Sequence, residues 1–206
     1  MIRTIFFDFG NVVAFFDHGR AIAQLKAFTD IPPVELALAL YGNPLEDDYE
    51  CGKLTTAEYV RLAKLAGRLT CSEEAFLAAF VDIFTANAEV CDLIPRLSPR
   101  YRLVIASNTN DAHYRKYTEQ FAGVLSHFQA LCPSHEAGHR KPHPGYYAFC
   151  QQSAEAEPGE CLFVDDMPVN IEAAERHGWK GLLYRPGEDL AGQLAKLGIQ
   201  FGPRSS

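Results

Sequence analysis

The chain has 206 residues, a length that suits one domain, or one domain with a sizeable insertion, and argues against two large independent domains. Hydrophobic residues make up 48% of it and charged residues 22%, which excludes intrinsic disorder and collagen-like structure. The formal net charge of -7 at pH 7 disfavours nucleic acid as a partner, because binding to a nucleic acid needs a basic surface. An anionic substrate would therefore need local help from a metal ion or a placed lysine.

The cysteines and the first residues of the chain give expectations about the cellular compartment of the protein. The six cysteines contain no C-x-x-C pair, which favours reduced thiols in a cytoplasmic protein, although their even number leaves disulfides open. No stretch reaches the ~20 apolar residues of a membrane span, and no cleavage site follows the apolar start of the chain. We therefore predict neither a signal peptide nor a membrane partner.

Four short apolar runs recur at wide separations along the chain. Each is too short for a helix and does not alternate with polar residues, so each predicts a strand that is buried on both faces of a parallel sheet. The runs cover residues 4–7, 102–106, 161–164 and 181–184, and a weaker run covers 128–132.

The segments between these runs have helical spacing. From about residue 16 to 87 no run resembles a strand, and Thr55 with Glu58 has the pattern of a capping box at a helix start. Further helices are predicted before Gly178 and Gly198, which suit C-caps. The sequence thus predicts an α/β fold: a Rossmann-like parallel sheet core of residues 1–15 and 88–206, with a helical cap of residues 16–87 inserted after the first strand.

Ligands of an open parallel sheet bind where the strands end, so the residues that follow the runs are the informative ones. Two acidic strand ends, a hydroxyl strand end and a lysine suit phosphoryl transfer, because a carboxylate attacks phosphorus while the other groups hold the phosphoryl oxygens and a divalent metal. These residues are Asp8, Ser107, Asn108, Lys141, Asp165 and Asp166.

The chain contains four ordered segments of interest: Phe6 to Val12, Ala106 to Asn110, Arg140 to Pro142 and Phe163 to Asp166. Together they resemble the motifs of the haloacid-dehalogenase-like hydrolases. Each segment alone is weak, but the four in order are specific, and a fifth, at 49–55, resembles part of that family's helical cap, so the resemblance covers nearly the whole chain. Within that family, the residues of these segments most resemble the bacterial glucose-1-phosphate phosphatase-like branch.

The resemblance implies a role for each of these residues. Asp8 would be the nucleophile that forms an aspartyl-phosphate. Mg²⁺ would be held by Asp8, the backbone carbonyl of Gly10 and Asp165, and Asp166 would support the metal indirectly, by contacting one of its ligands or through a water molecule. Ser107 and Asn108 would bind the transferring phosphoryl group, and Lys141 would pair with both that group and Asp8. The implied substrate is a small phosphorylated metabolite, most simply a sugar phosphate.

One position departs from the family pattern. Most phosphatases of this superfamily have a second aspartate two residues after the nucleophile as general acid and base, whereas this chain has Gly10. General acid–base catalysis contributes typically ~10²–10⁴-fold, so turnover is slow, or another group substitutes, or the leaving group needs little protonation. The nearest substitutes in sequence are Asp17 and His18.

Simpler interpretations exist for each residue. Asp8 alone suits a turn or helix cap, and Lys141 alone suits a solvated surface lysine. Residues 135–139 match the zinc motif H-E-x-x-H, but nearby prolines and Gly138 favour a loop over the helix that such a site needs. Two rival functions remain: a catalytically impaired protein that binds or senses a phosphometabolite, and a haloacid dehalogenase. The sequence is silent on oligomeric state.

Overall fold

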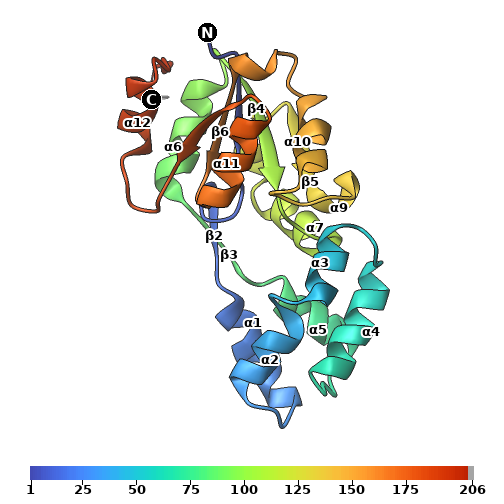
Figure 1. Ribbon diagram of the computed structural model, residues 1–206. Coiled ribbons are helices and arrows are strands. Elements are labelled where there is room, and N and C mark those ends of the chain that lie inside the picture. Colours follow the sequence, from blue (N-terminus) through green and yellow to red (C-terminus); the bar gives the residue numbers. More distant parts are fainter. Residues whose placement is uncertain (204–206) are drawn as a thin grey trace.

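The computed structural model describes residues 1–203 and contains a parallel sheet covered by helices on both faces (Figure 1). The strand order is β5-β4-β1-β6-β7, so the first strand lies at the centre, as expected for an open α/β sheet. All four pairings are parallel. The strands are β1 (Thr4–Phe7), β4 (Arg102–Ser107), β5 (Ala130–Pro133), β6 (Cys161–Asp165) and β7 (Lys180–Leu183).

The buried strands explain why their sequences do not alternate. In β1, Ile5 and Phe7 pack into one apolar cluster with helices on one face of the sheet, while Phe6 packs into a second cluster on the other face. All three side chains are fully buried, and each contributes about 1.5–3 kcal/mol of hydrophobic stabilisation. The predicted α/β fold is confirmed.

Helices on both faces connect these strands. The first cluster contains side chains of α6, α7 and α12, and the second contains those of α10 and α11. The helices of this part are α6 (Ala88–Leu97), α7 (Asp111–Gln120), α8 (Ala122–Leu125), α9 (Ser134–Ala137), α10 (Pro144–Gln151), α11 (Pro168–Arg176) and α12 (Leu190–Lys196), with a 3₁₀ turn at Pro158–Glu160.

Five helices form a separate bundle beyond the carboxyl edge of the sheet (Figure 1). They enclose their own apolar cluster, whose largest members include Tyr59, Phe76 and Phe80. The predicted capping box is present, with Thr55 and Glu58 each accepting from the other's backbone. The helices are α1 (His18–Leu25), α2 (Pro33–Leu40), α3 (Pro44–Glu50), α4 (Thr56–Ala66) and α5 (Glu73–Phe80), with a 3₁₀ turn at Lys26–Phe28.

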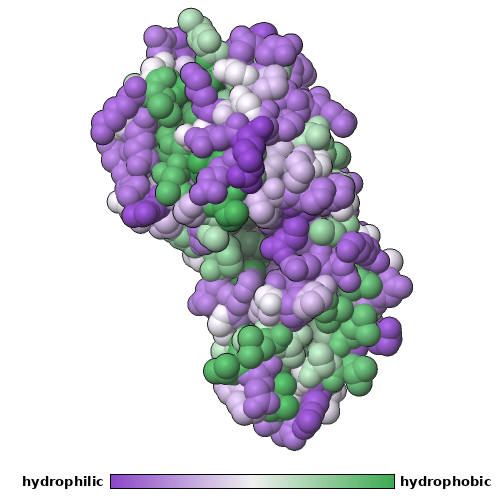
Figure 2. Space-filling view, in the orientation of Figure 1, coloured by the Kyte–Doolittle hydropathy of each residue, from purple (hydrophilic) through white to green (hydrophobic). Residues whose placement is uncertain are grey.

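Two short strands connect the bundle to the sheet. β2 (Ala14–Phe16) pairs antiparallel with β3 (Phe84–Ala86), so the chain enters and leaves the bundle side by side. The prediction that residues 16–87 hold helices throughout is wrong at this point, because strands of three residues are too short to give a periodic pattern. Figure 2 shows the molecule narrowing where these strands run.

Segment 134–139, which carries the zinc-like motif, also differs from the predicted loop. It begins as the single turn α9, which ends at Gly138 with φ +70°. His135 then contacts the Tyr114 ring, whereas His139 lies outside the helix and stacks on His143. The two histidines of the motif therefore do not share a helix face. Within residues 1–203, no helix has both the length and the apolar character that crossing a membrane requires.

Candidate active site

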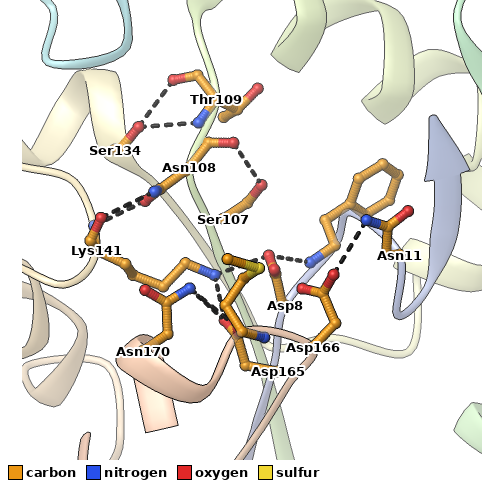
Figure 3. Close-up of polar contacts among 12 residues, drawn as sticks. Asp8, Asn11, Ser107, Asn108, Thr109, Ser134, Lys141, Asp165, Asp166 and Asn170 are labelled. Carbon is orange, nitrogen blue, oxygen red and sulfur yellow. Dashed lines mark hydrogen bonds and ion pairs between the residues drawn. The ribbon is translucent and has the colours of Figure 1, made fainter. Parts of the chain in front are cut away.

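Three strand ends meet at the carboxyl edge of the sheet. Asp8 directly follows β1, and Ser107 and Asp165 are the last residues of the flanking strands β4 and β6. The parallel register pairs Phe7 with both Ile105 and Val164, which brings these ends to one level. Figure 3 shows Asp8, Ser107 and Asp165 around a common centre, with Lys141 reaching in from the loop between α9 and α10.

Lys141 is buried and binds two of the carboxylates. Its Nζ lies 2.9 Å from Asp8 Oδ1 and 2.7 Å from Asp165 Oδ2. Burial alone would lower the pKa of the Lys141 ammonium, but the two carboxylates outweigh burial and raise it above its ordinary value. The lysine is therefore a fixed positive charge beside Asp8.

Asp8 is in an electrostatically unbalanced position. Burial raises the pKa of its carboxyl group, Asp165 and Asp166 raise it further, and Lys141 opposes them; the result is about 7. One oxygen from each of these three carboxylates lies within 4.8 Å of the others, yet a single lysine faces three acidic groups. The local excess of negative charge and the hard oxygen ligands fit a divalent cation such as Mg²⁺.

The remaining contacts of the acidic cluster orient its members. Asp165 accepts hydrogen bonds from the Met167 N–H at 2.8 Å and from Asn170 Nδ2 at 3.0 Å, and Asn11 Nδ2 donates to Asp166 at 3.0 Å. Asn11 and Asn170 escaped sequence analysis. Asn11 lay inside a recognised segment without a distinct role, and Asn170 carries no signal beyond its place in the helix after β6.

Asn108 has a different contact from the one expected. Its Oδ1 accepts from the Lys141 N–H at 2.7 Å and its Nδ2 donates to the Lys141 carbonyl at 3.1 Å, so both ends of the amide hold the Lys141 backbone. Its side chain thus positions the backbone of the lysine. The Ser107 hydroxyl makes a long hydrogen bond of 3.3 Å to the Asn108 carbonyl.

A cavity of about 80 Å³ separates the sheet from the helical bundle beside these residues. It is smaller than the ~300–1,000 Å³ of ordinary ligand sites, and it suits a group of phosphate size. The core contributes Gly10, Ser107 and Asn108 to its wall, and the bundle contributes His18, Glu46 and Glu50. Aromatic rings, among them Phe9, Phe16 and Phe84, complete it.

A larger cavity, about 570 Å³, opens at the opposite end of the sheet. It is lined by Arg3, Arg100 and Arg102, each of which already binds a neighbouring carboxylate or amide. It lies far from the carboxylate cluster, at the amino ends of the strands. We therefore place the candidate active site at the smaller cavity.

The space beside Gly10 is occupied by an aromatic ring. A Cβ atom at this position would lie 2.9 Å from Cε1 of Phe16, closer than packed carbon atoms approach. The wall therefore has no room for a side chain at residue 10 unless the Phe16 ring moves. The ring of Phe16, in β2, thus occupies the space that an aspartate side chain at residue 10 would need.

The two substitutes suggested by sequence occupy different environments. Asp17 is exposed and caps α1, accepting from the Gly19 N–H at 2.8 Å, and it is not among the residues that line the cavity. His18 does line the cavity, stacked on Tyr41 with ring centroids 3.7 Å apart. Burial lowers the pKa of His18 to about 4, so its imidazole is neutral near pH 7 and poorly suited to donate a proton.

Comparison with known families accords with this geometry. Residues 2–178 match the model of the haloacid dehalogenase-like hydrolases. The chain belongs to this family. It is accordingly a hydrolase, and its carboxylate cluster, lysine and strand-end serine occupy the ordered segments that carried the resemblance.

Relatives with known names cover the chain almost completely. It is 28% identical over 209 residues to D-ribitol-5-phosphate phosphatase of Bacteroides thetaiotaomicron, spanning 96% of this chain and 98% of that protein. A structure of a family enzyme from the same organism, in complex with magnesium and inorganic phosphate, superposes with TM-score 0.81 at 23% identity, covering 94% and 99% of the two chains.

Two further structures widen the comparison. A predicted family hydrolase from Porphyromonas gingivalis has TM-score 0.83 and 26% identity, covering 96% of this chain and 98% of that one. L-2-haloacid dehalogenase from Xanthobacter autotrophicus has TM-score 0.67 and 19% identity, covering 97% and 84%. Since the fold is shared by enzymes named for different reactions, the reaction has to be argued from the site.

Proposed function

We propose that this hydrolase is a Mg²⁺-dependent phosphatase that hydrolyses a small phosphate monoester through an aspartyl-phosphate on Asp8. The observation that carries the proposal is the Asp8 carboxylate, which lies beside Lys141 and two further carboxylates and directly precedes Phe9 in the wall of a phosphate-sized cavity. A dehalogenase needs no cation to offset a phosphate, and the three acidic groups beside one lysine favour phosphoryl transfer over that alternative.

The residues of the core divide the chemistry among them. An Asp8 oxygen attacks phosphorus, the bond to the leaving oxygen breaks, and water later cleaves the acyl phosphate to regenerate Asp8. The Lys141 ammonium, held by Asp165 and by Asn108 through its backbone, offsets charge on the phosphoryl oxygens. Ser107 supplies a hydroxyl to one of those oxygens.

Mg²⁺ would be held by Asp8, the Gly10 carbonyl and Asp165, with Asp166 alongside. When bound, the ion neutralises phosphate charge that would otherwise repel an anionic nucleophile. Asn11 keeps Asp166 in place for this role through its 3.0 Å hydrogen bond.

The helical bundle is proposed to act as a cap. Residues 16–87 would close over the core of residues 1–15 and 88–206, with β2 and β3 as the connection, to exclude bulk water and select the substrate. Support comes from the cavity, whose wall is shared between the two parts.

The substrate is proposed to be a sugar or sugar-alcohol phosphate. One relative that spans the chain is named for ribitol 5-phosphate, whereas the motif residues of this chain resemble those of the glucose-1-phosphate phosphatase-like branch. Glu46, Glu50 and His18 at the bundle side of the cavity offer hydrogen-bond partners for hydroxyl groups. A panel that includes ribitol 5-phosphate, glucose 1-phosphate and acetyl phosphate distinguishes these choices.

Phosphate release from that panel is the direct test. We expect Mg²⁺-dependent phosphate release that stops with EDTA and in the Asp8→Asn variant. The control variant Asp17→Asn, which changes the exposed N-cap residue of α1 outside the cavity, should retain phosphate release. Release that persists in pure Asp8→Asn protein would refute the nucleophile assignment.

One observation favours a second candidate, a catalytically impaired binding protein: the family's general acid position is Gly10, with Phe16 in the space beside it. Mg²⁺-dependent binding of a phosphorylated ligand without turnover of any panel member would support this candidate.

A further inference from the structure

The cap places two carboxyl groups at the cavity, Glu46 and Glu50, where the core residues of its wall have none. Glu46 already accepts a hydrogen bond of 2.6 Å from the Gly42 N–H, which leaves Glu50. Glu50, the last residue of α3, lines the cavity together with Gly10 and Ser107. Resting on the proposed phosphatase function, we infer that Glu50 is the general acid and base of this enzyme, supplied by the cap in place of a side chain at residue 10.

The position of Glu50 is fixed by contacts between the cap and the core. Its carbonyl accepts a hydrogen bond of 2.7 Å from Ser134 Oγ, and that serine also binds the Thr109 backbone next to the phosphate site. Two residues on, Gly52 lies against the His135 carbonyl so closely that a Cβ atom would overlap it. The end of α3 is therefore held against α9, which directly precedes the loop that carries Lys141.

The Glu50 carboxyl group is poorly satisfied by protein partners. Its side chain is 12% exposed, and Arg140 Nε lies 3.1 Å from its Oε2. That pair does not meet hydrogen-bond geometry, and within residues 1–203 both atoms lack a hydrogen-bond partner, since the Arg140 guanidinium turns its Nη1 to Asp47. An unsatisfied buried carboxyl oxygen destabilises the protein unless something binds it, which is expected of a group that meets its partner only in the complex.

Burial and two neighbouring carboxylates favour the protonated form of Glu50. Burial is the main cause, the neighbouring Glu46 and Asp8 carboxylates add to it, and Lys141 opposes them; together they raise the pKa of Glu50 to about 8. Arg140 with its partner Asp47, and the neutral His18 across the cavity, complete the titratable surroundings. A carboxylic acid that is neutral at pH 7 is suited to give a proton to a leaving group.

The two half-reactions balance on this residue. As Asp8 attacks phosphorus, the bond from phosphorus to the alcohol oxygen breaks and that oxygen takes the Glu50 proton, which leaves an aspartyl-phosphate, a free alcohol and a Glu50 carboxylate. The carboxylate then takes a proton from the water that attacks the phosphoryl group, so inorganic phosphate, the Asp8 carboxylate and protonated Glu50 are restored.

The experiment compares two leaving groups in the full-length Mg²⁺-loaded enzyme. Ribitol 5-phosphate releases an alkoxide that needs a proton, whereas p-nitrophenyl phosphate releases a phenolate that does not. For Glu50→Gln we expect kcat on ribitol 5-phosphate, or on the best alkyl phosphate of the panel, to fall by ~10²–10⁴-fold, and on p-nitrophenyl phosphate by less than ~10-fold. Glu35→Gln, an exposed glutamate of the same bundle, is the matched control and should match the wild type.

The pH profile gives a readout that a structural role would not change. Because Glu50 must be protonated, wild-type kcat on the alkyl phosphate should fall as pH rises through about 8, and this limb should vanish in Glu50→Gln and remain in Glu50→Asp. Equal losses on both substrates, or an unchanged pH limb, would overturn the inference while leaving the phosphatase function in place. Absence of turnover of either substrate by the wild type would instead refute the proposed function.

Discussion

Gly52 offers a sharp test of whether the cap must dock on the core for activity. It has φ +68°, and a Cβ atom there would overlap the carbonyl oxygen of His135. Gly52→Ala therefore adds two penalties: a left-handed backbone conformation, which costs an L-residue about 1–2 kcal/mol, and a clash with backbone that has no side-chain freedom to yield. The end of α3 must retreat by roughly 1 Å, a displacement that is capable of costing ~10²-fold in rate.

Gly42 is the matched control for this change. It lies in the same bundle with φ +65°, and no atom lies within 4 Å of a Cβ built on it. Gly42→Ala thus carries the backbone penalty alone, and both variants should lose roughly 2–4 °C of Tm per kcal/mol. Phosphate release and thermal denaturation, measured side by side, should show a ~10²-fold loss of kcat/KM in Gly52→Ala only. Equal activity in the two variants would refute the requirement for docking.

The other predictions concern the carboxylate cluster. Asp8→Asn should abolish turnover, yet raise the Tm of the metal-free protein at pH 8. The pKa of Asp8 in the folded protein is raised from 3.8 to about 7, so the ionised carboxylate destabilises the folded protein increasingly from pH 4 to pH 7 and fully above it. The gain in Tm of the variant should therefore shrink toward pH 4. Lys141→Met should destabilise the metal-free protein by about 3–5 kcal/mol in chemical denaturation, because buried carboxylates lose their partner. Mg²⁺ at 100 times its Kd should stabilise the wild type by about 2.7 kcal/mol and Asp165→Asn by much less, as measured by thermal shift. Gly10→Asp should speed turnover of alkyl phosphates only when Phe16→Ala makes room for it; a gain in the single variant would show that the ring yields easily.

The sheet and the acidic cluster were predictable because their signals are local. A strand buried on both faces has to be continuously apolar, and the polar residue that follows it has to lie at the carboxyl edge, so β1 with Asp8 and β6 with Asp165 can be recognised one segment at a time. Adjacent strands in parallel register then bring the two carboxylates to one level without further information.

Residues whose roles depend on tertiary contacts gave no such signal. Glu50 belongs to a recognisable segment, but its burial against the core and its proximity to Gly10 depend on how α3 docks. Asn108 was expected to bind the phosphoryl group. Its side-chain amide instead hydrogen-bonds the Lys141 backbone, a contact that depends on where the Lys141 loop lies in the fold. The strand pair β2 and β3 escaped notice because three residues establish no period.

The central claim is that Asp8 carries the phosphoryl group during turnover. The most direct measurement is mass spectrometry of acid-quenched enzyme, digested after brief exposure to Mg²⁺ and a substrate that the enzyme hydrolyses. A phosphoryl group on the peptide that contains Asp8, formed fast enough to account for turnover and absent in Asp8→Asn, is the predicted result. Turnover without that adduct, combined with undiminished phosphate release by Asp8→Asn, would contradict the claim.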